Sequence, residues 1–278
     1  MINRSATVMN KEQIESFAAE YALQSKYNYI DIDEAITPEL AGVQMFDSPL
    51  VGYSSAADPL YPKMKEPGVV GEHFCLPEDW LKEAKTVISF FFPFTEDVRN
   101  SNVGGKLPSS LWLHGRIEGQ RFLGEFASSL AQAINDKGGK AVVPILSPEF
   151  DFNNPKRNMM FNSNWSERHI AYISGLGTFS LTRGLITEKG MAGRFVSLVT
   201  DIDLEPSERK YSDVYEYCLK CGVCAKNCPV GAISVKKGKR QLPCGLYQKV
   251  MMKKYAPRYG CGKCQVGVPC EFTNPTAK

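Results

Sequence analysis

Cysteine placement constrains this chain of 278 residues more than any other sequence feature. Eight of its nine cysteines lie between Cys218 and Cys270. A run with the spacing C-x2-C-x2-C-x3-C-P contains four of them, Cys218, Cys221, Cys224 and Cys228. Three thiolates in two-residue steps can surround one [4Fe–4S] cube, while the fourth points toward a second cluster. Zinc sites also use C-x2-C pairs but seldom need this longer pattern, so the run favours iron–sulfur clusters over zinc.

The other four cysteines of this segment do not repeat the first spacing. They are Cys244, Cys261, Cys264 and Cys270. In proteins that hold two such clusters, the fourth cysteine of the run ligates the other cluster. If this exchange applies here, one cluster takes Cys218, Cys221, Cys224 and Cys270. The second cluster then takes Cys228, Cys244, Cys261 and Cys264, and the remaining Cys75 is expected to be a core residue.

Composition places the chain among ordinary globular proteins. It is 43% hydrophobic and 23% charged, which excludes collagen, coiled-coil and low-complexity classes. We find no apolar run of the roughly 18 residues that a membrane span requires. Residues 1–11 also lack the apolar stretch of a secretory signal. We therefore expect a cytoplasmic protein with no membrane partner, in a compartment where thiols stay reduced.

Charge is distributed unevenly along the chain. Residues 209–278 contain 14 Lys and Arg but only 3 Asp and Glu, whereas residues 1–208 contain 19 basic and 27 acidic side chains. A basic segment of this kind can bind RNA or an acidic protein partner. It can also compensate the negative charge of thiolate-ligated clusters within the same segment. We favour compensation and keep RNA as the alternative.

Apolar periodicity predicts a mixed body before the cysteine segment. Helices are expected over 11–25, over 118–137 and after a cap at Ser163 or Asn164, and strands over 86–92, 141–146 and 194–200. Alternating helices and strands indicate an α/β or α+β body over residues 1–205. A polar junction over 201–213 would lead into a second domain over 206–278.

The second cysteine set and parts of the body resemble a known family. Cys244 within RQLPCGLY, followed by Cys261-x2-Cys264, resembles the cluster domain of epoxyqueuosine reductases and the related reductive dehalogenases. Two segments of the body, LPEDWLKEAKTVISFFFPF (Leu76–Phe94) and SERHIAYISGLGTFSLTRGLIT (Ser166–Thr187), are also similar to that family. The resemblance covers about residues 76–272.

This resemblance implies an α+β fold with a nitroreductase-like body followed by a bacterial-ferredoxin-like domain that holds two [4Fe–4S] clusters. It implies an oxidoreductase whose clusters pass single electrons to cobalamin in the body, supplied by a reduced ferredoxin or flavodoxin-type donor. The Gly-Leu-Gly turn would lie against the corrin through Gly175, Gly177 and Thr178, because glycine allows close backbone approach. The alternative is a ferredoxin-type electron-transfer protein that docks a redox partner and binds no cobalamin.

Three departures from the family argue against tRNA as the substrate and leave the catalytic residue unknown. Residues 161–165, where epoxyqueuosine reductases carry an acidic proton donor, contain no carboxylate. The family's Gly-Lys after the Gly-Leu-Gly turn is replaced around Ser180. The chain also ends soon after Cys270, without the C-terminal helical repeats of the longer tRNA enzymes.

Overall fold

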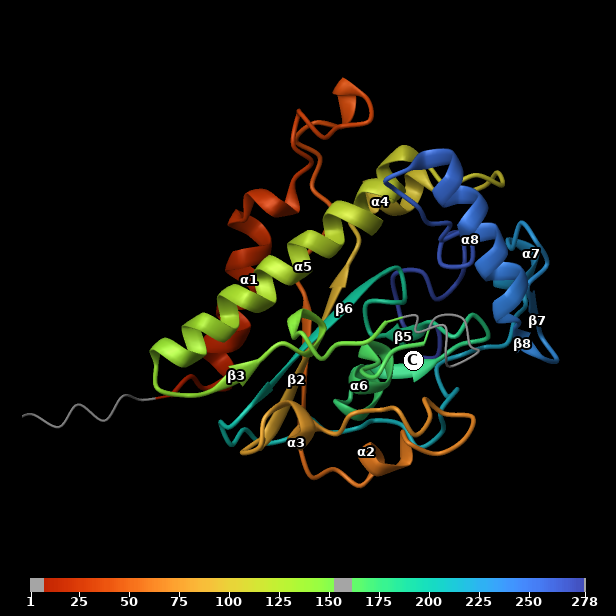
Figure 1. The fold of residues 1–278 in the computed structure, drawn as a ribbon. Helices are drawn as coiled ribbons and strands as arrows, with labels where there is room; N and C mark the ends of the chain where they lie inside the picture. The colour runs from red at the N-terminus through yellow and green to blue at the C-terminus, as the bar shows by residue number, and fades with distance from the viewer. Residues whose placement is uncertain (1–7, 153–161, 278) are drawn as a thin grey trace, which may run out of the picture.

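A four-stranded antiparallel sheet forms the centre of the body in the computed structural model, which describes residues 8–152 and 162–277 (Figure 1). Its order is β1-β2-β6-β3, and the strands are β1 (Leu50–Ser55), β2 (Thr86–Pro93), β6 (Gly193–Thr200) and β3 (Ala141–Val142). All four pair antiparallel, so the body is α+β. Mixed helix and strand content is therefore confirmed.

Helices α1 (Lys11–Gln24) and α5 (Ser110–Asp136) pack together against one face of this sheet (Figure 1). Side chains alternate between the two faces of a strand, so Phe90 and Phe92 of β2 both meet α5. Each has its ring centroid 4.9 Å from that of Phe126. Phe91, which points to the opposite face, packs with Ala171 of α6 (Glu167–Ile173) and with Leu176 and Leu185, which follow that helix. The sheet is thus covered on both sides, which explains why every residue of β2 is buried.

The remaining elements are short, apart from one helix in the cysteine segment. They are the helices α2 (Leu60–Lys63), α3 (Pro77–Trp80), α4 (Glu96–Ser101), α6 (Glu167–Ile173), α7 (Val223–Lys226) and α8 (Gln241–Tyr255), and the strands β4 (Gly177–Phe179), β5 (Leu185–Thr187), β7 (Ile233–Ser234) and β8 (Gly238–Lys239). Among the described residues, no helix is long and apolar enough to cross a membrane.

Several elements expected from the sequence are confirmed. Helix α1 lies within the range predicted for it and begins at a capping box, in which Asn10 and Gln13 bond each other's backbone N–H groups. Strands β2 and β6 lie where apolar, β-branched runs predicted them. Gly138 follows α5 with φ of 84°, the left-handed conformation that ends a helix.

Other boundaries were wrong for identifiable reasons. Helix α5 begins at Ser110, well before residue 118, because the Ser109 hydroxyl accepts a bond from the backbone N–H of Trp112 and caps it there. The strand expected over 141–146 ends at Val142, since proline at 144 has no N–H to donate and the chain enters a 3-10 helix, Pro144–Leu146. Helix α6 starts after Ser166 rather than after Ser163 or Asn164. The domain boundary near residue 205 stays a prediction.

Candidate functional site

The first cysteine run folds as a tight bend followed by the one-turn helix α7. Gly222 begins this helix with φ of 80°, and Lys220 just before it has φ of 51°. Left-handed backbone suits glycine and turns the chain sharply between successive thiols. Cys228 lies beyond the helix, where its sulfur accepts a hydrogen bond of 3.2 Å from the backbone N–H of Ala232. The run thereby separates its fourth thiol from the first three.

The first three thiols of the run line a small cavity, which we call cavity A. Its volume is about 20 Å³, and the side chains of Leu181, Met191 and Val268 contribute to its wall. The cysteines that line it are Cys218, Cys221, Cys224 and Cys270. Three thiols of the run thus share this cavity with a cysteine from the end of the segment.

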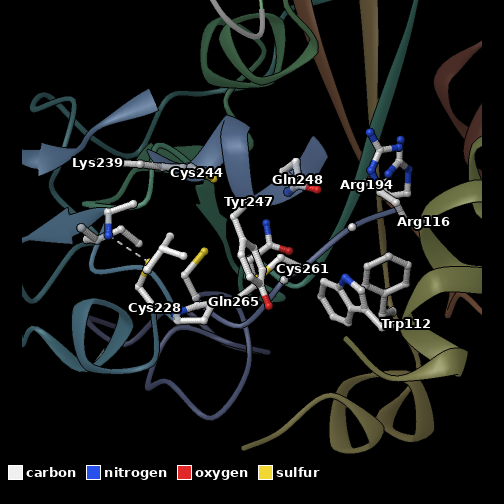
Figure 2. A pocket seen from close by; sticks show the side chains of 18 of the residues that line it. Trp112, Arg116, Arg194, Cys228, Lys239, Cys244, Tyr247, Gln248, Cys261 and Gln265 are labelled. Atoms are coloured by element: carbon white, nitrogen blue, oxygen red, sulfur yellow. Dashed lines mark hydrogen bonds between the residues drawn. The ribbon is translucent and has the colours of Figure 1, made fainter. Parts of the chain in front are cut away.

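A second and larger cavity, cavity B, lies between the cysteine segment and the body (Figure 2). Its volume is about 170 Å³. Four further cysteines line it: Cys228, Cys244, Cys261 and Cys264. Helix α8 contributes Cys244, and the C-x2-C pair after it contributes two of the other thiols. The thiols around each cavity are those that the exchange rule groups together.

The two sets of thiols are close to each other. The neighbouring Cys264 of cavity B raises the pKa of Cys224 in cavity A, and both thiols pack into one apolar cluster with Leu181 and Ile233. Groups bound in the two cavities would therefore be neighbours. Neighbouring redox centres can exchange electrons directly, which isolated ones cannot.

Burial raises the pKa values of several of these thiols. It raises the pKa of Cys261 to about 12 and that of Cys270 to about 12, and neighbouring thiols oppose ionisation further. Burial likewise raises the pKa of Cys224 to about 11. Metal binding requires thiolates, so loading these cavities with iron would release protons.

The C-x2-C pair of cavity B is fixed to the body through helix α5 and the loop before it. Gly262 has φ of 65°, and a Cβ added there would overlap the indole ring of Trp112. The Asn102 side chain donates a 2.9 Å hydrogen bond to the carbonyl of Cys261. The buried Lys263 ammonium donates to the carbonyls of Asn102 and Gly104 at 2.9 and 2.7 Å. These contacts position the thiols of cavity B relative to the sheet.

The body supplies the other end of cavity B with residues that sequence reasoning missed. Arg116 and Trp112 come from α5, and Arg194 comes from the start of β6 (Figure 2). The two arginines lie far apart in the sequence and belong to no motif. Only the packing of α5 against β6 brings them to one place, so no local signal predicts the pair.

The Gly-Leu-Gly turn lies elsewhere, and its residues pack against the chain itself. Gly175 has φ of 82° directly after α6 and ends this helix. A Cβ at Gly177 would overlap the carbonyl of Ile186 on the paired strand β5. Thr178 is fully buried, and its hydroxyl accepts a 2.8 Å bond from the backbone N–H of Tyr217. None of the three lines cavity A or cavity B, so their contact with a corrin stays a prediction.

The segment without a carboxylate has a structural role in its described part. Phe161 lies outside the described residues. Asn164 accepts a bond from the backbone N–H of Asp151 at 2.9 Å and donates to the carbonyl of Glu149 at 2.9 Å. The same amide lies 3.5 Å from the sulfur of Cys75, which is partly buried and lines neither cavity.

Sequence comparison identifies the cysteine run directly. The model of the 4Fe-4S binding domain family matches residues 211–234. The tetrachloroethene reductive dehalogenase of Desulfitobacterium hafniense is 36% identical over 74 residues, which are 26% of this chain and 13% of the dehalogenase. That of Dehalobacter restrictus matches to the same extent. The sequence match thus covers a small part of either protein.

Structure comparison extends the likeness to the body. An epoxyqueuosine reductase superposes with a TM-score of 0.52 at 17% identity, over 80% of this chain and 61% of that one. Another, with an epoxyqueuosine-modified tRNA-Tyr stem loop, gives 0.53 at 17% identity, over 94% and 66%. A reductive dehalogenase whose structure suggests a mechanism for B12-dependent dehalogenation gives 0.52 at 15% identity, over 82% and 30%. The chain therefore carries a 4Fe-4S binding domain and shares its fold with epoxyqueuosine reductases and reductive dehalogenases.

Proposed function

We propose that this chain is an iron–sulfur oxidoreductase that holds two [4Fe–4S] clusters, one in each thiol-lined cavity. Cys218, Cys221, Cys224 and Cys270 ligate the first, and Cys228, Cys244, Cys261 and Cys264 ligate the second. The observation that carries this proposal is the convergence of eight cysteines into two sets of four around adjacent cavities. Four thiolates per site are the ligand set of a cubane cluster.

The arrangement of the thiols favours clusters over single metal ions. Within residues 8–152 and 162–277, no group of three or more His, Cys, Asp or Glu side chains is placed to hold one ion. The four thiols of each set instead surround a space, as ligands of a multi-atom cluster do. Zinc would need four thiolates at about 2.3 Å from one point.

Exposure suggests where electrons enter. Cys221 is exposed, and Leu219 beside it is 52% exposed. Val235, 50% exposed, lies against Gly222 in the same run and precedes Lys236 and Lys237. An apolar patch with lysines around a cluster ligand fits an acidic electron carrier, such as a ferredoxin or flavodoxin-type protein. RNA binding by this basic segment stays a prediction.

The proposed route of the electrons leads from the exposed thiol toward the body. An electron entering at cavity A would pass to the neighbouring cluster of cavity B, which lies against the body. Cavity B extends beyond its thiols to Trp112 and the two arginines. We therefore place the electron acceptor, a small molecule, at the arginine end of cavity B. In this proposal, a nitroreductase-like body over residues 1–205 holds the acceptor, and a two-cluster domain over residues 206–278 follows it.

Cobalamin is a second candidate acceptor, supported by the fold shared with a B12-dependent reductive dehalogenase. The geometry of the described residues opposes it. Cavity B measures about 170 Å³, whereas pockets for drug-sized ligands measure roughly 300–1,000 Å³, and cobalamin is larger than such ligands. The glycines predicted to support the corrin are packed against β5 and the segment after β6. The described residues thus do not fit the corrin at cavity B.

Titration with cobalamin separates these candidates. We expect no binding of cobalamin to the reduced, cluster-loaded protein, measured by calorimetry and by the corrin absorption spectrum under anaerobic conditions. Binding with a dissociation constant on the order of tens of micromolar would establish cobalamin as the acceptor instead. If no small acceptor is reduced while a redox partner is, the chain is a ferredoxin-type carrier.

A further inference from the structure

Cavity B has two chemically different ends (Figure 2). At one end lie the thiols with Lys239, and at the other the guanidinium groups of Arg116 and Arg194 lie side by side with Trp112. No aspartate or glutamate lines the cavity. The arginine end is therefore a cationic recess without a fixed negative charge among the described residues that line it.

Both arginines have neutral partners. Arg116 donates a 3.0 Å hydrogen bond to the hydroxyl of Tyr259 and lies 4.8 Å from the centre of that ring. Arg194 donates from Nη2 to the side-chain carbonyl of Gln120, while its buried Nε has no hydrogen-bond partner. In the described part of the chain, neither forms an ion pair with a carboxylate. Two like charges held together with neutral partners are costly unless an anion joins them.

The thiols do not explain this pair of charges. Burial lowers the pKa of Arg194 well below its usual range, and the next contribution is the neighbouring Arg116. No thiol is among the groups that act on Arg194. Lys239 lines the thiol end of the cavity and already supplies a positive charge there. Arg116 and Arg194 are thus left for another ligand.

We propose that the arginine end of cavity B binds the carboxylate or phosphate group of a small organic anion, which is the substrate of this protein. Guanidinium groups bind such oxyanions through paired, charge-assisted hydrogen bonds. The aromatic side chains of Trp112, Phe94 and Tyr247 also line cavity B and would contact the rest of the molecule. The anion would thereby hold its reducible part toward the cluster of cavity B. This inference rests on the proposed function for the presence of that cluster.

Calorimetric titration of the cluster-loaded protein with inorganic phosphate, acetate and benzoate, at constant ionic strength, tests the site. We expect saturable binding of phosphate or of the carboxylates, and the preferred probe identifies the class of anion. Arg194→Gln and Arg116→Gln should each weaken that binding about 10- to 100-fold, because each removes hydrogen bonds from a charged donor. Arg194→Lys should retain more affinity than Arg194→Gln, since it keeps the charge.

Lys137→Gln is the matched control, because Lys137 lies at the far end of helix α5 from Arg116. It should leave anion affinity unchanged. Iron and sulfide contents of each variant report whether it folds and loads its clusters. Absence of saturable binding in the loaded wild-type protein would overturn the anion site and leave the two-cluster proposal standing. Binding that both glutamine variants retain would overturn it as well, whereas failure of the wild type to load iron would overturn the proposed function itself.

Discussion

Cys228→Ser should remove the cluster of cavity B and leave the cluster of cavity A in place. Cys228 belongs to the run in sequence, yet its thiol lines the other cavity together with Cys244, Cys261 and Cys264. A serine hydroxyl does not replace a soft thiolate as an iron ligand. Iron per chain, measured after anaerobic purification, should fall from about eight to about four, with sulfide falling in parallel.

Two further variants complete this test. Cys270→Ser should show the reciprocal loss, because Cys270 lines cavity A, whereas Cys261 and Cys264, which precede it in the sequence, line cavity B. Cys75→Ser should lose no iron, since Cys75 lines neither cavity. Electron paramagnetic resonance of the reduced variants distinguishes the cluster that remains. Loss of the cavity A cluster alone in Cys228→Ser would contradict the exchange of ligands.

Gly262→Ala should detach the cysteine segment from helix α5. The added Cβ would overlap the Trp112 ring, and Gly262 also has φ of 65°, which an L side chain rarely adopts. Overlap with a buried ring costs about 1–3 kcal/mol. The left-handed backbone adds about 1–2 kcal/mol. We expect a lower thermal unfolding midpoint and loss of the cluster in cavity B, measured under anaerobic conditions.

Gly267→Ala is the control for backbone strain. Gly267 has φ of 60°, but the nearest atom to an added Cβ is 3.6 Å away, on Val103. The strained backbone should lower the stability of this variant, but the added Cβ overlaps no other atom. Gly267→Ala should therefore keep the cluster of cavity B and lose less stability than Gly262→Ala. Equal destabilisation by the two substitutions would show that the Trp112 contact does not hold the segment in place.

The sequence could predict those parts of the site in which the spacing of residues along the chain determines which side chains come together. Three cysteines in two-residue steps bring their thiols to one cavity without any contribution from the body, whereas the grouping of Cys270 with them depended on the exchange rule. No spacing of residues along the chain predicts the arginine end of cavity B. Arg116 and Arg194 meet because α5 packs across β6, a contact that depends on the whole sheet.

Glycines were harder to interpret from sequence. The Gly-Leu-Gly turn suggested contact with a cofactor, which stays a prediction, and in the structure Gly175 ends a helix and Gly177 allows close approach of strand β5. Strand β1 was missed within a stretch rich in Gly, Pro, Asp and Ser. Its Gly52 is required because a Cβ there would overlap the carbonyl of Ser174. For Gly52 and Gly177, the reason for the glycine lies in another segment of the chain.

Iron and sulfide analysis of the anaerobically purified wild-type protein, combined with spin quantification after reduction, tests the central claim most directly. Two cubane clusters predict about eight iron and eight sulfide per chain, and two interacting paramagnetic centres after reduction. Stoichiometric zinc without inorganic sulfide would contradict the account, because eight thiolates would then hold single ions rather than clusters.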